Sequence, residues 1–397
     1  MFRQIVAISS TNLQTLHTRL GASSVVVIGV AGVVFVLTAL LAMANGLKET
    51  LRSTGEADRV LILGKGSHSE INGSITREQA GILAGEPGIV ATHDARGLRI
   101  ALASPEIYAT ANLTRRNGTR AGLPLRGVGD AAFRVRPEVT IIAGRRFEPG
   151  RFELVVGDGA ARVFAGLSVG DRISIKGATF DVVGHFAAVG NATESEAWMD
   201  VDVMANVFRR GPYLQSVLAR LESPAALTTL TEAIETDRRL SNSLFRESDF
   251  YAAQSERSTH LMTVVGIAAA AIMALGATFA SLNSLYAAVA ARTREIAILR
   301  ALGFSATAVI TSVLAESLAL AALGGLLGAA LGWAAFDGAS MASVGATYSQ
   351  VAFRFAVTPR LLAAGFGLAL SIGLVGGLLP AMRAARQNIV VGLRTLV

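Results

Sequence analysis

One long apolar segment precedes a large, mostly polar region of this chain, and three more follow it. The first uncharged run covers residues 21–47, and the others cover 261–291, 301–336 and 361–382, with Glu316 as the only interruption. At a rise of about 1.5 Å per residue, each run is long enough to cross a hydrocarbon core of roughly 30 Å. The pattern predicts an α-helical membrane protein with four transmembrane helices, one before and three after an extramembrane domain.

Arginines close to the ends of these segments predict how the chain is oriented. They precede the first segment, fill the link between the second and third, and follow the fourth: Arg3, Arg19, Arg292, Arg294, Arg300, Arg383, Arg386 and Arg394. Because cytoplasmic loops of membrane proteins are enriched in Lys and Arg, we place these arginines in the cytoplasm and the large domain outside it. This topology accounts for the net charge of +7, so we expect no nucleic-acid partner.

The domain boundaries follow from these segments. In chain order we expect a cytoplasmic N-terminal amphipathic helix (1–20), transmembrane helix 1 (21–47), an extracytoplasmic domain (48–258), transmembrane helix 2 (259–291), a cytoplasmic helix (292–305), transmembrane helix 3 (306–336), a short extracytoplasmic loop (337–358), transmembrane helix 4 (359–382) and a cytoplasmic tail (383–397). A signal peptide cleaved after Ala44 is the alternative for the first segment. Its apolar run is longer than that of an ordinary signal peptide, which favours a retained helix.

The extracytoplasmic domain alternates short β-rich runs with turns and brief helical patterns, which predicts a mixed α+β fold of two lobes. The expected strands are Arg59–Leu63, Gly97–Ala101, Glu153–Gly157, Arg172–Ile175, Thr179–Val183 and Leu214–Arg220. The expected helices are Thr76–Ala84, Gly159–Phe164, Val201–Arg209 and Pro224–Arg239, the last capped by Ser223.

Arginines are concentrated in one interval of this domain. They are Arg96, Arg99, Arg115, Arg116, Arg120, Arg126, Arg134, Arg136, Arg145, Arg146 and Arg151. Such an interval could contact acidic membrane lipids or an acidic partner. We favour the simpler interpretation, an ordinary solvated surface.

The domain has no recognisable catalytic or metal-binding motif. Gly64–Ser67 resembles the end of a phosphate-binding loop but lacks the first glycine of that motif, so a turn is expected. The pairs His68 with Glu70 and His93 with Asp94 lack the further ligands of a zinc site. The sequence has no cysteine and no G-x-S-x-G motif. We therefore expect neither catalytic residues nor a bound metal.

Small residues recur every four positions in the last two apolar segments. These stripes contain Gly324, Gly328, Gly332, Gly365, Gly373 and Gly377, with Ala369. Small residues let membrane helices approach closely, so each stripe predicts a helix contact, either within one subunit or with a second one. Glu316 is the only formal charge within a segment, and we expect it to form a hydrogen bond between helices.

The link between the second and third segments mixes arginines, a glutamate and apolar residues at helical spacing and ends at Gly303. It could offer ionic and apolar contacts to a cytoplasmic partner. An exposed connector explains the same pattern equally well.

Several motifs resemble the MacB and FtsX group of ABC-transporter permeases, which includes the lipoprotein-releasing permeases. The most specific are RTREIAILRALGFS at residues 292–305 and GGLLPAMRAAR at residues 376–386, followed by a VGLR tail. Looser similarities are AGRRF at 143–147, VVG at 155–157, GDRISI at 170–175 and FDVVG at 180–184. The one-plus-three arrangement of apolar segments is also typical of this group.

The resemblance implies a permease of the bacterial inner membrane that is not an enzyme itself and that forms a homodimer or heterodimer. ATP and Mg would be bound by a separate ABC ATP-binding subunit, because residues 1–397 contain no Walker A motif. The link between segments two and three would be the coupling helix that contacts this ATPase. Its expected contact residues are Arg292, Arg294, Glu295, Ile296, Ile298, Leu299, Arg300 and Gly303.

Two functions of different class remain open at this point. The first is export or extraction of a lipid, lipoprotein, peptide or amphiphile, driven by movements of the extracytoplasmic domain, with membrane lipids and a periplasmic adaptor as further partners. The second is mechanical signalling to an extracytoplasmic partner such as a cell-wall hydrolase. The size of the domain favours transport, by analogy alone.

Overall fold

The computed structural model describes residues 20–93, 97, 99–344, 350–387 and 389. The chain forms two compact units. The unit that we call the sheet domain contains Gly46–Thr259 and Ser340–Arg354. The other, the helical unit, contains the residues up to Asn45, then His260–Ala339, and those from Phe355 onward. The expected amphipathic helix at 1–20 lies outside the described residues, apart from its last position.

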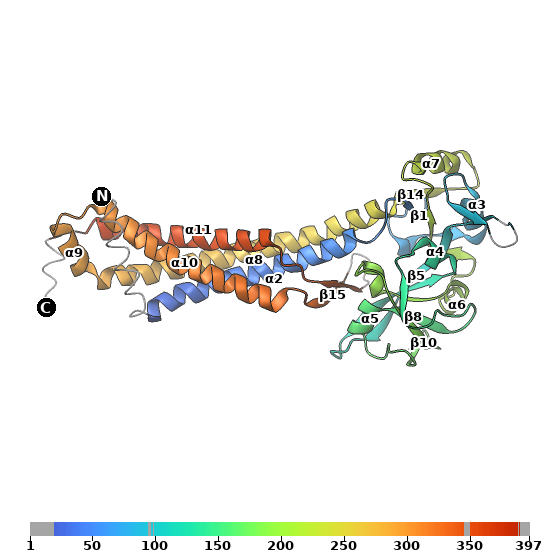
Figure 1. The fold of residues 1–397 in the computed structure, drawn as a ribbon, viewed down its shortest axis with the longest axis horizontal. Helices are drawn as coiled ribbons and strands as arrows, with labels where there is room; N and C mark the ends of the chain where they lie inside the picture. Colours follow the sequence, from blue (N-terminus) through green and yellow to red (C-terminus); the bar gives the residue numbers. More distant parts are fainter. Residues whose placement is uncertain (1–19, 94–96, 98, 345–349, 388, 390–397) are drawn as a thin grey trace. The chain divides into compact units, whose positions relative to one another are not determined.

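Four long helices build the helical unit (Figure 1). They are α2 (Leu20–Arg52), α8 (Glu247–Ala291), α10 (Ala306–Phe336) and α11 (Pro359–Ala385), and α9 (Thr293–Ala301) is a short helix between α8 and α10. Within the described residues, these four are long and apolar enough to cross a membrane. The four predicted apolar helices are therefore confirmed.

Local sequence signals begin the last two long helices. The Ser305 hydroxyl accepts a hydrogen bond from the Ala308 amide at 3.2 Å and caps α10. Thr358 caps α11 in the same way, and Pro359 occupies its first turn, where a missing amide proton leaves no helix hydrogen bond unmade. Both helices consequently start at the residues that we expected for transmembrane helices 3 and 4.

Helix α8 is much longer than a membrane span requires. It starts at Glu247, well before the predicted start at residue 259, and runs without interruption for 45 residues. At about 1.5 Å per residue its length is roughly 68 Å. Its first part belongs to the sheet domain and its remainder to the helical unit. One continuous helix therefore connects the two units.

A ten-stranded mixed sheet forms the centre of the sheet domain, in the order β14-β1-β13-β5-β6-β11-β8-β10-β7, with β9 paired to β10. Its strands are β1 (Arg59–Gly64), β5 (Ala103–Thr114), β6 (Arg120–Val128), β7 (Thr140–Gly144), β8 (Glu153–Gly157), β9 (Arg172–Ile175), β10 (Ala178–Ala187), β11 (Ala197–Asp200), β13 (Ser216–Arg220) and β14 (Asn242–Arg246). The β6–β11 and β8–β10 pairs are parallel, and the other pairs are antiparallel. The predicted mixed fold is confirmed, whereas the two lobes are not.

Short helices and smaller strand pairs surround this sheet. The helices are α3 (Arg77–Gly85), α4 (Ala131–Val135), α5 (Asp158–Val163), α6 (Val201–Val207) and α7 (Ala226–Thr236), with 3-10 turns η2 (Glu70–Asn72) and η3 (Ala192–Ser195). The strand pairs are β2 (Ile75–Thr76) with β12 (Tyr213–Leu214), β3 (Ala91–His93) with β4 (Arg99–Ala101), and β15 (Ser340–Val344) with β16 (Gln350–Arg354). The segment 337–358, predicted to be a short extracytoplasmic loop, thus contains the paired strands β15 and β16.

One local prediction in this domain was wrong, and two long strands were not predicted. Helix α7 begins at Ala226, because the preceding residues form a turn in which the Ser223 carbonyl accepts a hydrogen bond from the Ala226 amide at 3.0 Å. Ser223 is therefore not its cap. The long strands β5 and β6 were missed because Pro105, Glu106 and Arg126 interrupt their apolar pattern.

Candidate functional site

The corner between α8 and α10 contains the segment that we predicted to be a coupling helix. Helix α8 ends at Ala291, Arg292 occupies the turn, and α9 follows in a new direction. Gly303 adopts a φ of +93°, a left-handed conformation that favours glycine, and its amide donates to the Arg300 carbonyl at 3.1 Å. These two turns define α9 as a separate short helix at the end of the helical unit (Figure 1).

Arg292 and Glu316 form an ion pair at this corner. The Arg292 guanidinium donates to the two Glu316 carboxylate oxygens at 3.1 and 3.3 Å, and both residues are more than nine-tenths buried within the chain. Glu316 thus forms the expected hydrogen bond, with a residue of the turn between α8 and α9. Its partner lies just beyond the end of the second apolar segment, where the family resemblance had implied a coupling role instead.

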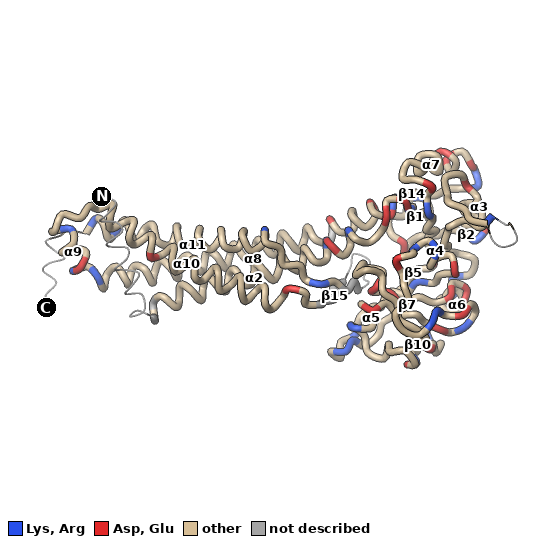
Figure 2. The backbone as a smooth tube through the Cα atoms, viewed as in Figure 1, with Lys and Arg blue, Asp and Glu red and all other residues tan. Residues whose placement is uncertain are grey.

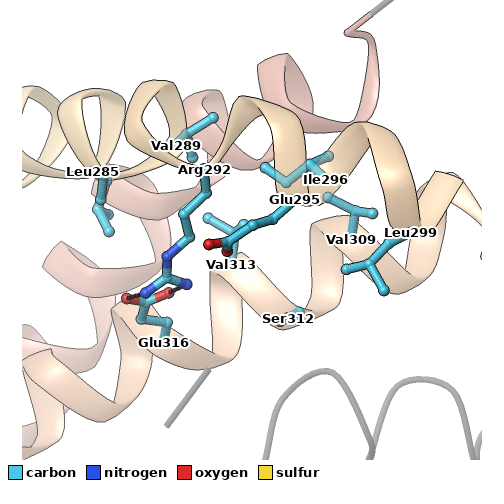
Figure 3. A pocket seen from close by; sticks show the side chains of 11 residues that line it. Leu285, Val289, Arg292, Glu295, Ile296, Leu299, Val309, Ser312, Val313 and Glu316 are labelled. Carbon is cyan, nitrogen blue, oxygen red and sulfur yellow. Dashed lines mark hydrogen bonds and ion pairs between the residues drawn. The ribbon is translucent and has the colours of Figure 1, made fainter. Parts of the chain in front are cut away.

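A small pocket of about 40 Å³ adjoins this ion pair. Figure 3 shows the Arg292 guanidinium pointing across it to Glu316, with Glu295 and Leu299 of α9 on its wall. Ile296 is buried beside it, in an apolar cluster with Val289, Val309, Val313, Ala381 and Ala384. The inner face of α9 is consequently packed against the ends of α8, α10 and α11.

Further contacts fasten α9 and α8 to the end of α11. The Arg300 guanidinium donates to the Ala385 carbonyl at 2.7 Å, and the Gln387 amide donates to the Thr293 hydroxyl at 3.3 Å. The central carbon of the Arg383 guanidinium lies 5.4 Å from the centre of the Tyr286 ring of α8. The three helix ends and α9 therefore form one connected block of the helical unit.

The contact residues predicted for α9 divide between its two faces. Arg294, Glu295 and Ile298 are exposed in the chain alone, as is Leu302, which was not predicted. Arg292 and Ile296 are buried within the chain, where the first pairs with Glu316 and the second fills the apolar cluster. Leu299 and Arg300 are half-buried. Figure 2 shows charged residues at α9 and few along the four long helices.

The glycine stripes pack inside the helical unit. A Cβ at Gly324, Gly328 or Gly332 would meet atoms of α2, and at Gly328 it would lie only 2.4 Å from the Ala31 carbonyl oxygen. A Cβ at Gly373 or Gly377 would meet Ala321 or Ser317 of α10, and one at Gly365 would meet Val34 of α2. The two stripes thus allow α2, α10 and α11 to approach closely within a single chain.

A second charged cluster lies inside the sheet domain, where the sequence predicted a solvated surface. Arg126, only 1% exposed, donates five hydrogen bonds to three carboxylates, those of Glu70, Glu106 and Glu196. Arg136, 3% exposed, donates to both oxygens of Glu106 at 2.6 and 3.0 Å. The solvated interpretation was therefore wrong for these two arginines.

The charges in this cluster stabilise one another. Burial alone raises the pKa of the Glu106 carboxyl, but the positive charges of Arg136 and Arg126 outweigh it and lower that pKa to about 2. Burial alone lowers the pKa of Arg126, but the charges of the three carboxylates outweigh burial and raise this pKa well above its ordinary value. A sequence signal was available, since Arg126 stands in the apolar run LPLRGV, where an unpaired charge would be costly.

Two family profiles cover most of the chain. The family described as "MacB-like periplasmic core domain" matches residues 23–237, and the "FtsX-like permease C-terminal" family matches residues 267–389. Together they include most of the sheet domain and the corner with α9.

Curated relatives agree with these families. The macrolide export ATP-binding/permease protein MacB of Shewanella oneidensis is 23% identical over 97% of this chain and 58% of its own length. The MacB protein of Hyphomonas neptunium is 25% identical over 57% of this chain and 35% of its own length. An uncharacterized ABC transporter permease of Bacillus subtilis, YknZ, is 30% identical over 36% of this chain and 34% of its own length. The chain thus spans only part of the length of these relatives.

Among solved structures, the periplasmic region of MacB from Actinobacillus actinomycetemcomitans covers 52% of this chain and 96% of that one, with a TM-score of 0.38 and 15% identity. The extracellular domain of YknZ covers 47% of this chain and 99% of that one, with a TM-score of 0.36 and 15% identity. Because a single periplasmic-core profile already spans more than half of the sequence, this chain belongs to the MacB-like and FtsX-like family of ABC-transporter permeases.

Proposed function

We propose that this chain is the permease subunit of an ABC transporter that converts ATP hydrolysis in the cytoplasm into movement of its sheet domain outside the inner membrane. The cargo would be a lipid, lipoprotein, peptide or other amphiphile. A separate ABC ATP-binding subunit would bind ATP and Mg, and two permease copies, or this chain and a paralogue, would form the membrane dimer. The names of the MacB relatives, which combine export with ATP binding, support this coupling.

The connection between α9 and α8 is the observation that carries the proposal. The Arg292–Glu316 pair and the Ile296 cluster fasten the inner face of α9 to the helix ends, while Ile298 and Leu302 leave apolar surface exposed on its outer face. Helix α8 continues from this corner into the sheet domain without a break. A force applied to the outer face of α9 would therefore act at the end of a helix that continues into the sheet domain.

The test is purification of the tagged chain from its native membrane in mild detergent, followed by mass spectrometry of co-purifying proteins. The double variant Glu295→Arg with Ile298→Asp changes two exposed residues of α9 and keeps the buried Arg292, Ile296 and Glu316. The matched control carries the same two kinds of change at exposed positions of the sheet domain, Glu222→Arg with Ile142→Asp.

We expect an ABC ATP-binding subunit to co-purify with the native chain and with the control, and to be lost from the α9 variant while that variant stays monodisperse. Absence of any such ATPase from the native chain in several detergents would contradict the proposal. The alternative function, mechanical signalling, predicts an extracytoplasmic hydrolase in the same eluate, whereas transport predicts an adaptor or ATPase activity that depends on cargo.

A further inference from the structure

The sheet domain contains a partly open cavity of about 870 Å³ that has no part in the coupling corner. Its walls come from the loop at residues 66–72, from the paired strands β5 and β6, from the η3 region, and from residues 244–254, where β14 passes into α8. All of these residues belong to the sheet domain. The volume lies within the roughly 300–1,000 Å³ that small-molecule sites occupy, so the cavity can hold a molecule of several hundred daltons.

One wall of the cavity is aromatic. Tyr108, Phe245, Phe250 and Tyr251 line it, although only 6% of the chain is aromatic. The Phe250 ring contacts both Phe245 and Tyr251, with ring centres 5.9 and 5.6 Å apart. Aromatic faces attract both apolar groups and organic cations.

Another wall consists of the buried ion cluster. Glu70 and Glu196 line the cavity, and the exposed Asp249 lies on the same lining. Arg126 also lines it, but its five hydrogen bonds to carboxylates occupy all five of its N–H donors. Arg126 therefore has no donor left for a ligand, whereas carboxylate oxygens can accept further hydrogen bonds.

The charges around the cavity do not balance. Its lining contains the acids Glu70, Glu196 and Asp249 against the arginines Arg126 and Arg246, with His68 counted as neutral. Adding Glu106 and Arg136, which are bonded together behind this wall, leaves the same excess of one negative charge. A partly enclosed site with aromatic walls and excess negative charge favours a positively charged ligand.

We propose that this cavity binds a cationic amphiphile, an organic molecule of drug size with an apolar body and one positively charged nitrogen. The apolar body would contact the aromatic wall, and the cation would lie near the Glu70, Glu196 and Asp249 carboxylates. The interpretation of this ligand as transported cargo rests on the proposed function. Because the first residues of α8 line the cavity, a bound ligand would contact the helix that leads to the coupling corner.

Because the chain has no cysteine, the cavity can be tested with single engineered thiols. The variant Ser69→Cys places a thiol on the cavity wall, and Ser174→Cys places one at an exposed position of strand β9 outside it. The full-length chain in detergent is treated with neutral N-ethylmaleimide, and the rate of modification is followed by intact-mass spectrometry. Rhodamine 6G serves as the cationic probe and fluorescein as an anionic probe with a similar ring system.

We expect rhodamine 6G to slow modification of Ser69→Cys by roughly tenfold at ten times its Kd, as competitive occupancy requires. Fluorescein should have no such effect, and neither probe should protect Ser174→Cys. Adding Asp249→Asn should raise the half-protecting concentration of rhodamine 6G roughly two- to fivefold, the size of an exposed ionic contact. The matched change Asp181→Asn, on β10 outside the cavity, should leave it unchanged.

Equal protection by both probes, protection at both thiols, or none at Ser69→Cys would overturn the proposal. If Ser69→Cys does not fold, Ser67→Cys offers a second thiol on the same lining. This binding test needs no ATPase, and the co-purification test needs no ligand. Failure of one proposal is therefore distinguishable from failure of the other.

Discussion

Arg292 and Glu316 are the two charged residues that join the turn after α8 to the middle of α10 within the helical unit. They are buried side by side, and each guanidinium hydrogen bond ends on a different carboxylate oxygen. The pair forms where α9 leaves α8, so it fixes the direction of the helix that we propose to contact the ATPase. This relationship makes Glu316 a positioning residue of that corner.

Removal of one member of this pair should destabilise the helical unit. In Glu316→Ala the Arg292 guanidinium stays buried without a counter-charge, which costs about 3–5 kcal/mol in comparable pairs. Thermal unfolding of the detergent-purified chain measures this loss. The double variant Arg292→Met with Glu316→Leu removes both charges and should regain most of the stability. The idea fails if the double variant is no more stable than Glu316→Ala.

Gly328 should tolerate no side chain at all. A Cβ at this position would lie 2.4 Å from the Ala31 carbonyl oxygen, so Gly328→Ala must push α10 away from α2. We expect a loss of about 1–3 kcal/mol in thermal unfolding, as for other overpacked contacts. Gly367→Ala on α11 is the control, since nothing lies within 4 Å of its added methyl group and alanine favours a helix by about 0.5–1 kcal/mol. Equal effects of the two changes would contradict this packing.

The stability of the sheet domain should require an arginine at position 126, and a lysine should not replace it. A lysine there has three donors on one nitrogen and cannot reach three carboxylates with the planar geometry of a guanidinium. Arg126→Lys should therefore cost about 3 kcal/mol or more, because buried carboxylates lose their partner. The control is Arg172→Lys, whose ion pair with Asp181 is solvent-exposed and should contribute less than about 1 kcal/mol.

The fluorescence of Trp198 provides the measurement. Trp198 is fully buried and its indole N–H donates to Glu196 at 2.8 Å, next to Arg126. The other tryptophan, Trp333, is half exposed on α10, so a Trp333→Phe background isolates the signal of the sheet domain. Unfolding in denaturant is followed by the fluorescence of Trp198. Identical unfolding curves for Arg126→Lys and for the chain with Arg126 would refute the prediction.

Acid should weaken the sheet domain in a defined pH window. The pKa of Glu106 falls from its ordinary value of 4.5 to about 2 in the folded chain, because Arg136 and Arg126 outweigh the effect of burial. A lowered carboxyl pKa contributes stability that is present above about pH 4.5 and is lost as pH falls towards 2. In Glu106→Gln, unfolding followed at Trp198 should show lower stability at neutral pH and a weaker decrease below pH 4.5. An unchanged slope in that window would exclude Glu106 as its cause.

Much of the helical unit could be predicted because its signals are local. Long uncharged runs, Ser305 and Thr358 as caps and Pro359 in the first turn are properties of neighbouring residues, and the helices begin where these signals stand. The length of α8 could not be predicted in this way. Its first residues, from Glu247, are polar enough to read as part of the extracytoplasmic domain, and the sequence does not show that they continue the same helix.

The candidate sites show the same division. The α9 segment was found from its mixed pattern and its family motif, but which of its faces is buried depends on α8, α10 and α11. The ion cluster around Arg126 was missed because its members come from β5, β6, η2 and the residues after α4 and η3, and only the folded domain brings them together.

The sequence by itself determined that this chain has four apolar helices, a mixed sheet domain and the motifs of an ABC-transporter permease, since hydropathy, caps and motifs act over short stretches of chain. Only the tertiary structure decided which charges are buried and with whom. Arg292 and Arg126 look like surface arginines in the sequence, yet each is buried against carboxylates far away in the chain. A buried charge requires a partner in space, and the order of residues does not specify that partner.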